Sequence, residues 1–355
     1  DQPAKFLVNG TAVEETTIDA LKEGKKVGTY TIDPLTGEVT FTPNKDFVGT
    51  PDAVTVQVKD ENGTTATAKY TPTVTPVTPT GEDVTSTGKQ GKVQTGTPKF
   101  TEGDAEVPLK VDADQPAKFV VNGTAVEETT IDALKNGTKV GTYTINPLTG
   151  EVTFTPNKDF VGTPDAAKVQ VKDENGTSVI AKYTPTVTPV TPTGEDVTST
   201  GKQGKVQTRT PKFTEGDAEV PLKVDADQPA KFVVNGNTVD DTTIDATKEG
   251  AKVGTYTINP LTGEVTFTPN KDFVGTPDAV TVQVKDENGT NATAKYTPTV
   301  TAVTPTGEDV TSTGKQGKVQ TGTPKFTEGD VEVPLKVDAD QPAKFVVNGN
   351  TVDDT

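Results

Sequence analysis

The stretch "TYTIDPLTGEVTFT", residues 29–42, decides the predicted fold because two alternating segments flank a turn signal. Tyr30 and Ile32 alternate with threonines before the turn, and a valine and a phenylalanine alternate with threonines after it. Alternation with a period of two is typical of a strand that buries one face. Proline at the second turn position and Gly37, which can adopt positive φ, favour a reversal of the chain. We therefore predict a β-hairpin.

The residues that follow the hairpin form a predicted bend. In "PNKDFVGT", residues 43–50, we expect Phe47 to pack back into the core. Gly49 can adopt conformations closed to other residues, so we expect it to let the chain turn toward the next strand. We assign this stretch a structural role and no catalytic one.

Alternating patterns recur on both sides of a second turn. "AVTVQV" (53–58) and "TATAKYT" (65–71) flank "KDENGT" (59–64), whose Asn-Gly pair is a strong hairpin signal. "EVPLKV" (106–111) alternates as well, and Pro108 places it at a sheet edge. Many short strands, Gly and Pro turns and no sustained helical pattern predict an all-β fold, an Ig-like antiparallel β-sandwich.

The same text returns along the chain with a constant period. "DQPAKF" begins at Asp1 and again at Asp114, Asp227 and Asp340, so the period is 113 residues (114 − 1). That period is too long for a solenoid unit of roughly 20–50 residues. It matches one complete small domain, so we predict tandem domains that each fold alone.

Proline-rich linkers divide the predicted domains. The stretch "TPTVTPVTPTGED" (71–83) is the most linker-like, because prolines cannot donate to a central sheet and favour extended geometry. It returns at 184–196 and, with one change, at 297–309. The predicted domains are residues 1–76, the C-terminal part of a repeat; 77–189 and 190–302, two complete repeats; and 303–355, the N-terminal part of a further repeat. The partial repeats at both ends indicate a slice of a longer chain.

Two segments have no clear strand pattern. "TTIDALKEG" (16–24) fits either a short helix ending at Gly24 or another structure, and Thr247 in place of Leu21 weakens the helical stripe in the third copy. "GEDVTSTGKQGKVQTGT" (81–97) has few apolar residues and many Gly and Thr, which predicts weak order.

Composition excludes several classes of function. The chain has 51 acidic and 34 basic residues, a net charge of −17, which disfavours binding to nucleic acid. It has no Cys and no His, so disulfides, thiolate metal sites and the commonest general base are absent. No run approaches the ~20 apolar residues of a membrane span. We predict a protein that is not an enzyme and has no nucleic-acid partner and no membrane span in this sequence.

Clustered carboxylates are the candidate ligands for calcium. "EGD" (102–104), "VDAD" (111–114) and "KDENG" (59–63) supply the oxygen ligands that this ion prefers. None has the spacing of a known calcium loop, and solvated surface charge explains them better. We assign no catalytic, cofactor-binding or metal-binding residue, and we expect no cofactor, with calcium as the alternative.

Two lysines are candidates for an isopeptide cross-link, in which a buried Lys joins an Asn beside an acid. Lys69 lies between Ala68 and Tyr70, which are predicted to point inward, so Lys69 should point outward. Lys5 stands in the same relation to Phe6. We therefore do not predict the cross-link. Exposed Thr and Lys on the strand faces could contact a glycan or a protein, but no aromatic patch marks such a face.

Longer stretches resemble a known family. They are "GEVTFTPNKDFVGTPD" (37–52), "VKDENGT" (58–64), "YTPTVTPVTPTG" (70–81) and "TSTGKQGKVQTGTPKF" (85–100). This text is similar to the CshA-type fibril repeats, the tandem modules of streptococcal (Gram-positive) cell-wall-anchored fibrillar adhesins. The resemblance covers essentially the whole chain, and the last two stretches are the most specific.

The resemblance implies an extracellular protein of the bacterial cell surface. It implies anchorage to peptidoglycan through a C-terminal region missing from this sequence, and an N-terminal region that binds the host. The family has no catalytic residues to transfer. We expect the tandem sandwiches to form an elongated rod, a non-enzymatic stalk that projects the adhesive region. The alternatives are repeats that themselves bind host proteins or glycans multivalently, and lateral contacts between fibrils in a biofilm.

Overall fold

The protein consists of strands and turns. The computed structural model describes residues 2–353, and these contain no helix. The chain divides into two compact units, residues 1–189 and 190–355, and each is described by itself. The predicted all-β fold is confirmed.

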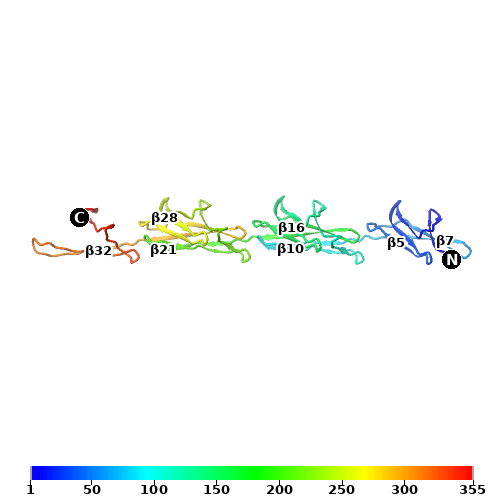
Figure 1. Ribbon diagram of the computed structural model, residues 1–355, viewed down its shortest axis with the longest axis horizontal. Helices are drawn as coiled ribbons and strands as arrows, with labels where there is room; N and C mark the ends of the chain where they lie inside the picture. Colours follow the sequence, from blue (N-terminus) through cyan, green and yellow to red (C-terminus); the bar gives the residue numbers. More distant parts are fainter. Residues whose placement is uncertain (1, 354–355) are drawn as a thin grey trace. The chain divides into compact units, whose positions relative to one another are not determined.

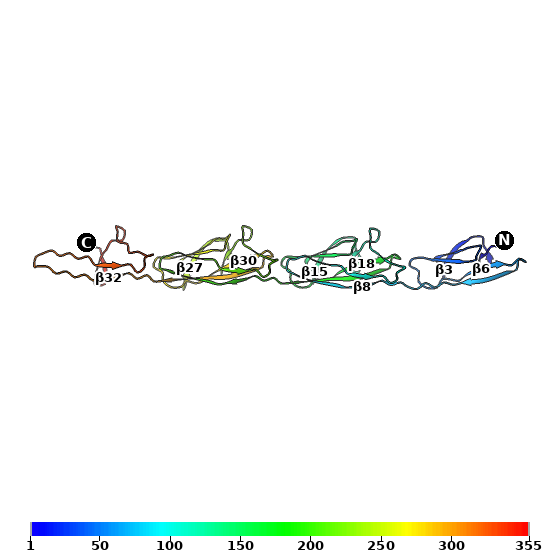
Figure 2. The same ribbon diagram turned by 90° about the horizontal axis from the view of Figure 1, so that it is seen from below.

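The first unit contains a partial and a complete repeat. Residues 1–76 contain β1 (Lys5–Val8), β2 (Thr11–Ala12), β3 (Thr17–Lys22), β4 (Lys25–Ile32), β5 (Val39–Pro43), β6 (Val54–Lys59) and β7 (Thr65–Tyr70). Residues 77–189 contain β8 (Thr80–Glu82), β9 (Val84–Lys89), β10 (Gln94–Gly96), β11 (Lys99–Thr101), β12 (Leu109–Lys110), β13 (Lys118–Val121), β14 (Thr124–Ala125), β15 (Thr130–Lys135), β16 (Thr138–Ile145), β17 (Val152–Pro156), β18 (Ala167–Asp173) and β19 (Ser178–Thr188). Figure 2 shows β15 and β18 within the complete sandwich, and β3 and β6 within the partial repeat.

The second unit contains a complete and a partial repeat. Residues 190–302 contain β20 (Thr193–Glu195), β21 (Val197–Lys202), β22 (Gln207–Arg209), β23 (Lys212–Thr214), β24 (Leu222–Lys223), β25 (Lys231–Val234), β26 (Asn237–Val239), β27 (Thr243–Lys248), β28 (Ala251–Ile258), β29 (Val265–Pro269), β30 (Val280–Asp286) and β31 (Asn291–Thr301). The rest contains β32 (Thr306–Glu308), β33 (Lys325–Thr327), β34 (Phe345–Val347) and β35 (Asn350–Val352). Figure 1 shows β21 and β28 in its complete sandwich.

Each complete sandwich has two sheets of fixed order. In residues 77–189 one sheet has the order β14-β13-β18-β19-β9, with β12 also on β18, and the other has the order β10-β17-β16-β15. The second unit repeats both orders with β21, β31, β30, β25, β26 and with β22, β29, β28, β27. All neighbours are antiparallel except β9 with β19 and β21 with β31, which are parallel. The predicted antiparallel sandwich is thus confirmed, and each complete sandwich also contains one parallel pair of strands.

Two parts make each complete sandwich, and we name them the front segment and the body. The front segment is residues 80–101 (β8–β11) in one sandwich and 193–214 (β20–β23) in the other. The body is residues 118–188 (β13–β19) or 231–301 (β25–β31). The front segment adds one edge strand to each of the two sheets of the body. The first repeat shows a body alone, and the last repeat shows a front segment, residues 306–327.

The core of a complete sandwich is aromatic at its centre. Tyr143 meets Phe154 with ring centroids 5.2 Å apart and meets Tyr183 edge to face at 6.3 Å. Such offset and edge-to-face pairs add to the free energy of burying the rings. Phe160, the counterpart of Phe47, is buried in the same cluster, as predicted for this position. Phe47 itself is only half-buried in the first repeat, where it meets Phe41 edge to face at 6.4 Å.

The opening hairpin forms as the sequence predicts. β4 pairs with β5, and Gly37 has a φ of 73°. Asp33 stabilises the turn, because its Oδ1 accepts a hydrogen bond from the Leu35 N–H at 2.9 Å. The Asp33 N–H also donates to the Glu38 carbonyl at 2.8 Å. The turn therefore carries its own hydrogen bonds and needs no distant residue.

The helical alternative for residues 16–24 is wrong. These residues form β3, which pairs with β4. Glu23 and Gly24 both have positive φ, 50° and 78°, as a two-residue hairpin turn of type I′ requires. Leu21 is partly exposed, so the threonine at its place in the third copy removes no core residue.

The predicted linker is shorter than its composition suggests. In the complete repeats its first five residues, 184–188, continue β19 and pair with β9. Val187 exchanges both backbone hydrogen bonds with Gly162, at 2.9 and 2.8 Å. Backbone groups alternate in direction along a strand, so Pro185 faces the same side as Val187. On that side β18 pairs with β19 only as far as Tyr183. The N–H that Pro185 lacks therefore removes no hydrogen bond between these two strands.

The segment 81–97, expected to be weakly ordered, forms most of the front segment. β9 pairs with β19 from Val84 beside Tyr183 to Lys89 beside Thr188. β10 pairs with β17. Backbone hydrogen bonds to the body therefore order a segment that has few apolar side chains of its own. Pro108 does mark an edge, because β12 pairs with β18 alone among the described strands.

Candidate functional site

The carboxylates proposed as calcium ligands serve as turn caps. Asp104 Oδ1 accepts the Glu106 N–H at 2.8 Å. Asp112 Oδ1 accepts the N–H groups of Asp114 and Gln115, each at 2.9 Å. The hydrogen bond from the Gln115 backbone holds the pKa of Asp112 below its ordinary value. These aspartates are therefore engaged with their own backbone, as in Asx turns.

Two of the clusters come close together. Asp114 and Gln115 share a hollow of about 270 Å³ with Gly176, which ends the "KDENG" turn of the second copy. Lys118 and Lys172 line the same hollow, and their positive charges oppose binding of a cation. Within residues 2–353, no three His, Cys, Asp or Glu residues form a group that could hold a metal ion.

The two lysines proposed for a cross-link both reach the surface. Lys69 is exposed, as the alternation predicts. The Lys5 ammonium contacts the Glu14 carboxylate, and Lys118 contacts Glu127 at 2.5 Å in the same way. Both ammonium groups therefore meet an exposed carboxylate instead of a buried asparagine.

A buried polar cluster that sequence reasoning missed joins the front segment to the body. In the second unit the Ser199 hydroxyl lies 2.5 Å from Gln207 Oε1 and 2.7 Å from the Tyr296 hydroxyl. Gln207 Nε2 donates to the Thr299 carbonyl at 3.0 Å. The first unit repeats the cluster with Ser86. Polar groups in this position satisfy one another and lock one arrangement of strands.

Burial governs the protonation of Tyr296, in this cluster, and of Tyr256, whose ring meets that of Tyr296 at 6.2 Å. Burial raises the pKa of Tyr296 above its ordinary value, and the hydrogen bond with Ser199 opposes that shift. Burial also raises the pKa of Tyr256. Both phenols are therefore protonated at neutral pH and act as hydrogen-bonding and packing groups.

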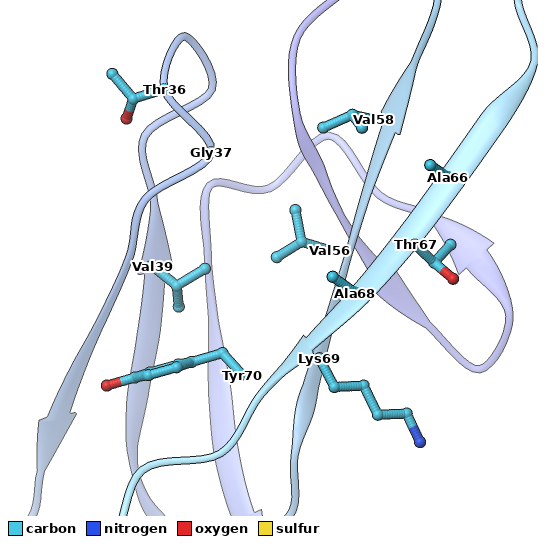
Figure 3. Close-up of a pocket in the computed structure, with 10 residues that line it drawn as sticks. All are labelled: Thr36, Gly37, Val39, Val56, Val58, Ala66, Thr67, Ala68, Lys69 and Tyr70. Atoms are coloured by element: carbon cyan, nitrogen blue, oxygen red, sulfur yellow. The ribbon is translucent and has the colours of Figure 1, made fainter.

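An apolar groove lies on the body of the first repeat. It measures about 420 Å³ and is lined by β5, β6 and β7. Figure 3 shows the side chains of Val39, Val56 and Tyr70 around one hollow, with Lys69 directed away from it. The lining is mostly apolar, with Thr36, Thr67 and Lys69 as its polar members.

The same positions are covered in the complete sandwiches. Tyr70 is 39% exposed, whereas its counterpart Tyr296 is 0% exposed. Val58 is 45% exposed, and its counterpart Val284 is 2% exposed. The difference arises because the front segment lies over this face in the complete sandwich and pairs with its edge strands.

A contact between neighbouring repeats occurs inside the second unit. Lys202, at the end of β21, lies 2.5 Å from Asp330 and 3.7 Å from Glu332. The hydrogen bond from Lys202 holds the pKa of Asp330 below its ordinary value. In addition, the Val303 N–H donates to Gln203 Oε1 at 3.4 Å. A complete sandwich thus touches the front part of the next repeat through one loop.

Comparison with known families identifies the repeats. Four consecutive segments, residues 1–74, 76–187, 189–300 and 302–355, match the family described as the surface adhesin CshA repetitive domain. The chain belongs to this family. The CshA repeat is a surface adhesin module, which implies an extracellular protein of the cell surface. The described residues of this CshA chain include no helix long and apolar enough to cross a membrane.

Solved structures with tandem domains resemble the chain distantly. Mouse cadherin-23 EC22-24 is 13% identical, with 85% of this chain and 100% of that chain covered and a TM-score of 0.28. The I9-I11 tandem of titin is 12% identical, with 85% and 89% covered and a TM-score of 0.27. No curated protein matches the chain.

Proposed function

We propose that these CshA repeats form a non-enzymatic stalk, which holds the adhesive region of a longer adhesin away from the cell wall. The observation that supports it best is the parallel pairing of β9 with β19. Because the first long strand and the last strand run in the same direction, the chain enters a sandwich at one end and leaves at the other. Gly81 lies beside Ile180, and Lys89 lies beside Thr188. Eight residues of strand advance the chain by roughly 26 Å.

Contacts and charge between repeats support an extended arrangement. The loop contact of Lys202 with Asp330 restrains one junction within the second unit. Proline-rich connections restrict the conformations open to the remaining linker residues. The net charge of −17 disfavours collapse of one repeat onto another. We propose boundaries between these repeats at 76/77, 189/190 and 302/303, and an elongated rod as the resulting form.

Small-angle X-ray scattering tests the stalk directly. We compare residues 77–189 with residues 77–302 and expect the maximum dimension to rise by roughly 30 Å or more for the added repeat. It should rise again for residues 1–355, which add a partial repeat at each end. Compact particles, whose maximum dimension rises only slightly with each added repeat, would contradict the proposal.

Adhesion by the repeats themselves is the second candidate, and membership of a surface adhesin family favours it. Near-identical modules in tandem would multiply a weak contact through effective concentration. We test it by measuring retention of one, two and three repeats on immobilised host matrix proteins and glycans. Retention that increases steeply with copy number supports it, and equal background retention removes it.

The remaining parts of the proposal concern anchorage and cofactors. We propose that the longer adhesin is anchored to peptidoglycan through residues beyond this sequence, and that the stalk works without a cofactor. An unchanged melting temperature with calcium and with a chelator is the expected result. A higher melting temperature in the presence of calcium would instead support a metal-stabilised junction.

A further inference from the structure

The first long strand and the last strand of each complete sandwich lie side by side and run in the same direction. β9 pairs with β19 from Val84 beside Tyr183 to Lys89 beside Thr188, and β21 pairs with β31 in the same register. The chain enters a sandwich ahead of β9 and leaves it after β19. A pull on the two ends of a repeat therefore draws β9 and β19 in opposite directions along the axis that they share.

This direction of pull loads the strand pair in shear. The backbone hydrogen bonds of a parallel pair are evenly spaced and run slantwise between the strands. A force along the strands is shared among all of these bonds, which must break together, whereas a force across one end breaks them one after another. Because forced unfolding is governed by the rate at which the unfolding barrier is crossed, a shared load slows it.

Further hydrogen bonds fix both ends of this pair. Ahead of β9, the Asp83 carboxylate accepts the Lys182 N–H at 2.7 Å. At the other end, the Thr188 hydroxyl donates to the Gly88 carbonyl at 3.1 Å, and the Gln90 N–H donates to the Thr188 carbonyl at 2.8 Å. The second unit has the same three bonds. The two strands are therefore joined over their whole paired length.

Side chains join the middle of the pair. The Ser86 hydroxyl of β9 lies 2.7 Å from the Tyr183 hydroxyl of β19, and Gln94 Nε2 donates to the Thr186 carbonyl of β19 at 3.1 Å. The second unit repeats both bonds. Shielding from water strengthens hydrogen bonds of this kind, so they add to the resistance of the backbone ladder.

The rest of the sandwich lies outside the path of the load. Tension passes from β9 to β19 across their shared ladder, while β18 holds β19 from its other side through six residue pairs. The Tyr143 hydroxyl donates to the Asp165 carbonyl at 2.8 Å, and this bond involves neither β9 nor β19. Separation of β9 from β19 is therefore the first step that tension must bring about.

We propose that residues 83–90 and 182–188, which contain the paired parts of β9 and β19, form a mechanical clamp that keeps a complete repeat folded while the chain is under tension. Residues 196–203 and 295–301 form the clamp of the second complete repeat. The clamp is a property of one sandwich. Only the source of the tension rests on the proposed stalk function, because a stalk bears any force that acts between an attached adhesive region and the cell wall.

Single-molecule force spectroscopy of the full chain tests the direction of loading. With one handle at each end of the chain, both complete sandwiches are pulled in shear and should unfold at similar forces. We then move the first handle to Val93→Cys, which is a unique attachment point because the chain has no other cysteine. Val93 is 57% exposed and follows β9 in the turn whose Gln90 N–H meets the end of β19. The sandwich of residues 77–189 is then pulled at one of its ends only, so its strands peel apart.

The second complete sandwich serves as the control in the same molecule. Residues 190–302 are still pulled at their own two ends, and their unfolding releases more chain than the part of the first sandwich that follows Val93. We expect the sandwich of residues 77–189 to unfold at a several-fold lower force, while that of residues 190–302 keeps its force. Equal unfolding forces in the two directions of loading would overturn the proposal.

Matched tyrosine variants separate the clamp from general stability. Tyr183→Phe with Tyr296→Phe removes the hydroxyl bonds inside both clamps. Tyr143→Phe with Tyr256→Phe removes hydroxyl bonds to backbone carbonyls outside them. With handles at both chain ends and a constant force, the first pair should unfold about fivefold to tenfold faster, the factor expected for one lost hydrogen bond. The second pair should unfold at the rate of the unchanged chain, because its bonds are still intact when the clamp breaks.

Urea unfolding without force completes the comparison. Both pairs of variants should lose stability there, so a difference that appears only under force reports the position of the bond. A control pair that unfolds under force as fast as the clamp pair would overturn the proposal. Scattering and force distinguish the two proposals: an elongated chain whose repeats unfold at equally low force in both directions keeps the stalk and removes the clamp, and a compact chain with strong repeats does the reverse.

Discussion

The complete repeat 190–302 and the first repeat, residues 1–76, share the body sequence and differ in the burial of the same side chains. Tyr296 is fully buried, and Tyr70 is partly exposed. The inner residues of β31 are buried, whereas all six residues of β7 are exposed. A front segment with few apolar side chains therefore completes a core that the body cannot close.

This difference shows that a segment with few apolar side chains can complete a hydrophobic core. The front segment contributes two edge strands, a serine, a glutamine, a valine and a phenylalanine to the interior. Its stability comes from backbone pairing and from the polar cluster, both of which require the body. Variants placed at matched positions of covered and uncovered repeats test this account.

The largest expected effect is at the tyrosine that the front segment covers. Tyr183→Ala should destabilise the complete repeat of residues 1–189 by about 3–5 kcal/mol, because it removes a fully buried ring. Tyr70→Ala should cost clearly less, since this ring is already partly in water. Urea unfolding, with a separate transition fitted for each repeat, measures both losses. Equal losses would contradict the role given to the front segment.

An intermediate effect is expected at the buried serine. Ser199→Ala should destabilise its repeat by ~1–2 kcal/mol, because it removes the hydrogen bonds of the serine hydroxyl with Gln207 Oε1 and with the Tyr296 hydroxyl. Ser312→Ala removes the matching bond where the cluster is exposed, so its loss should be close to zero. Thermal unfolding of residues 190–355 with each variant makes the comparison. A larger loss for Ser312→Ala would show that the front segment is stable without a body.

The smallest effect is expected at the contact between repeats. The pKa of Asp330 is lowered in the folded chain, so the contact with Lys202 is present above the ordinary aspartate range and is lost as the pH falls through the lowered value. Lys202→Ala should raise the pKa of Asp330 toward its ordinary value. NMR titration of the side-chain carboxyl measures it. Lys315→Ala, at the same position of the last repeat, is the control and should leave that pKa unchanged.

Local sequence predicted the hairpins because both partners and the turn lie within a few residues of each other. Asp33 and Gly37 provide the hydrogen bond and the positive φ that the first turn needs. The sequence left the secondary structure of residues 16–24 undecided, because "TIDAL" suits a helix or a strand. Pairing with β4 makes this segment a strand. The use of the clustered aspartates as turn caps was not predicted, nor was the burial of Asp173 and Asp286, the aspartates of the "KDENG" turn in the complete repeats.

By itself, the sequence determined the period of 113 residues, the all-β class and the inward positions of the alternating strands. Periodicity and turn chemistry act over a few residues, so they can be recognised without a structure. Only the tertiary structure decided that residues 81–97 are ordered and that the prolines at 184–188 continue a strand. The reason is that the partners of the front segment, such as Tyr183 for Ser86, lie 97 residues away, and no local pattern records a contact at that distance.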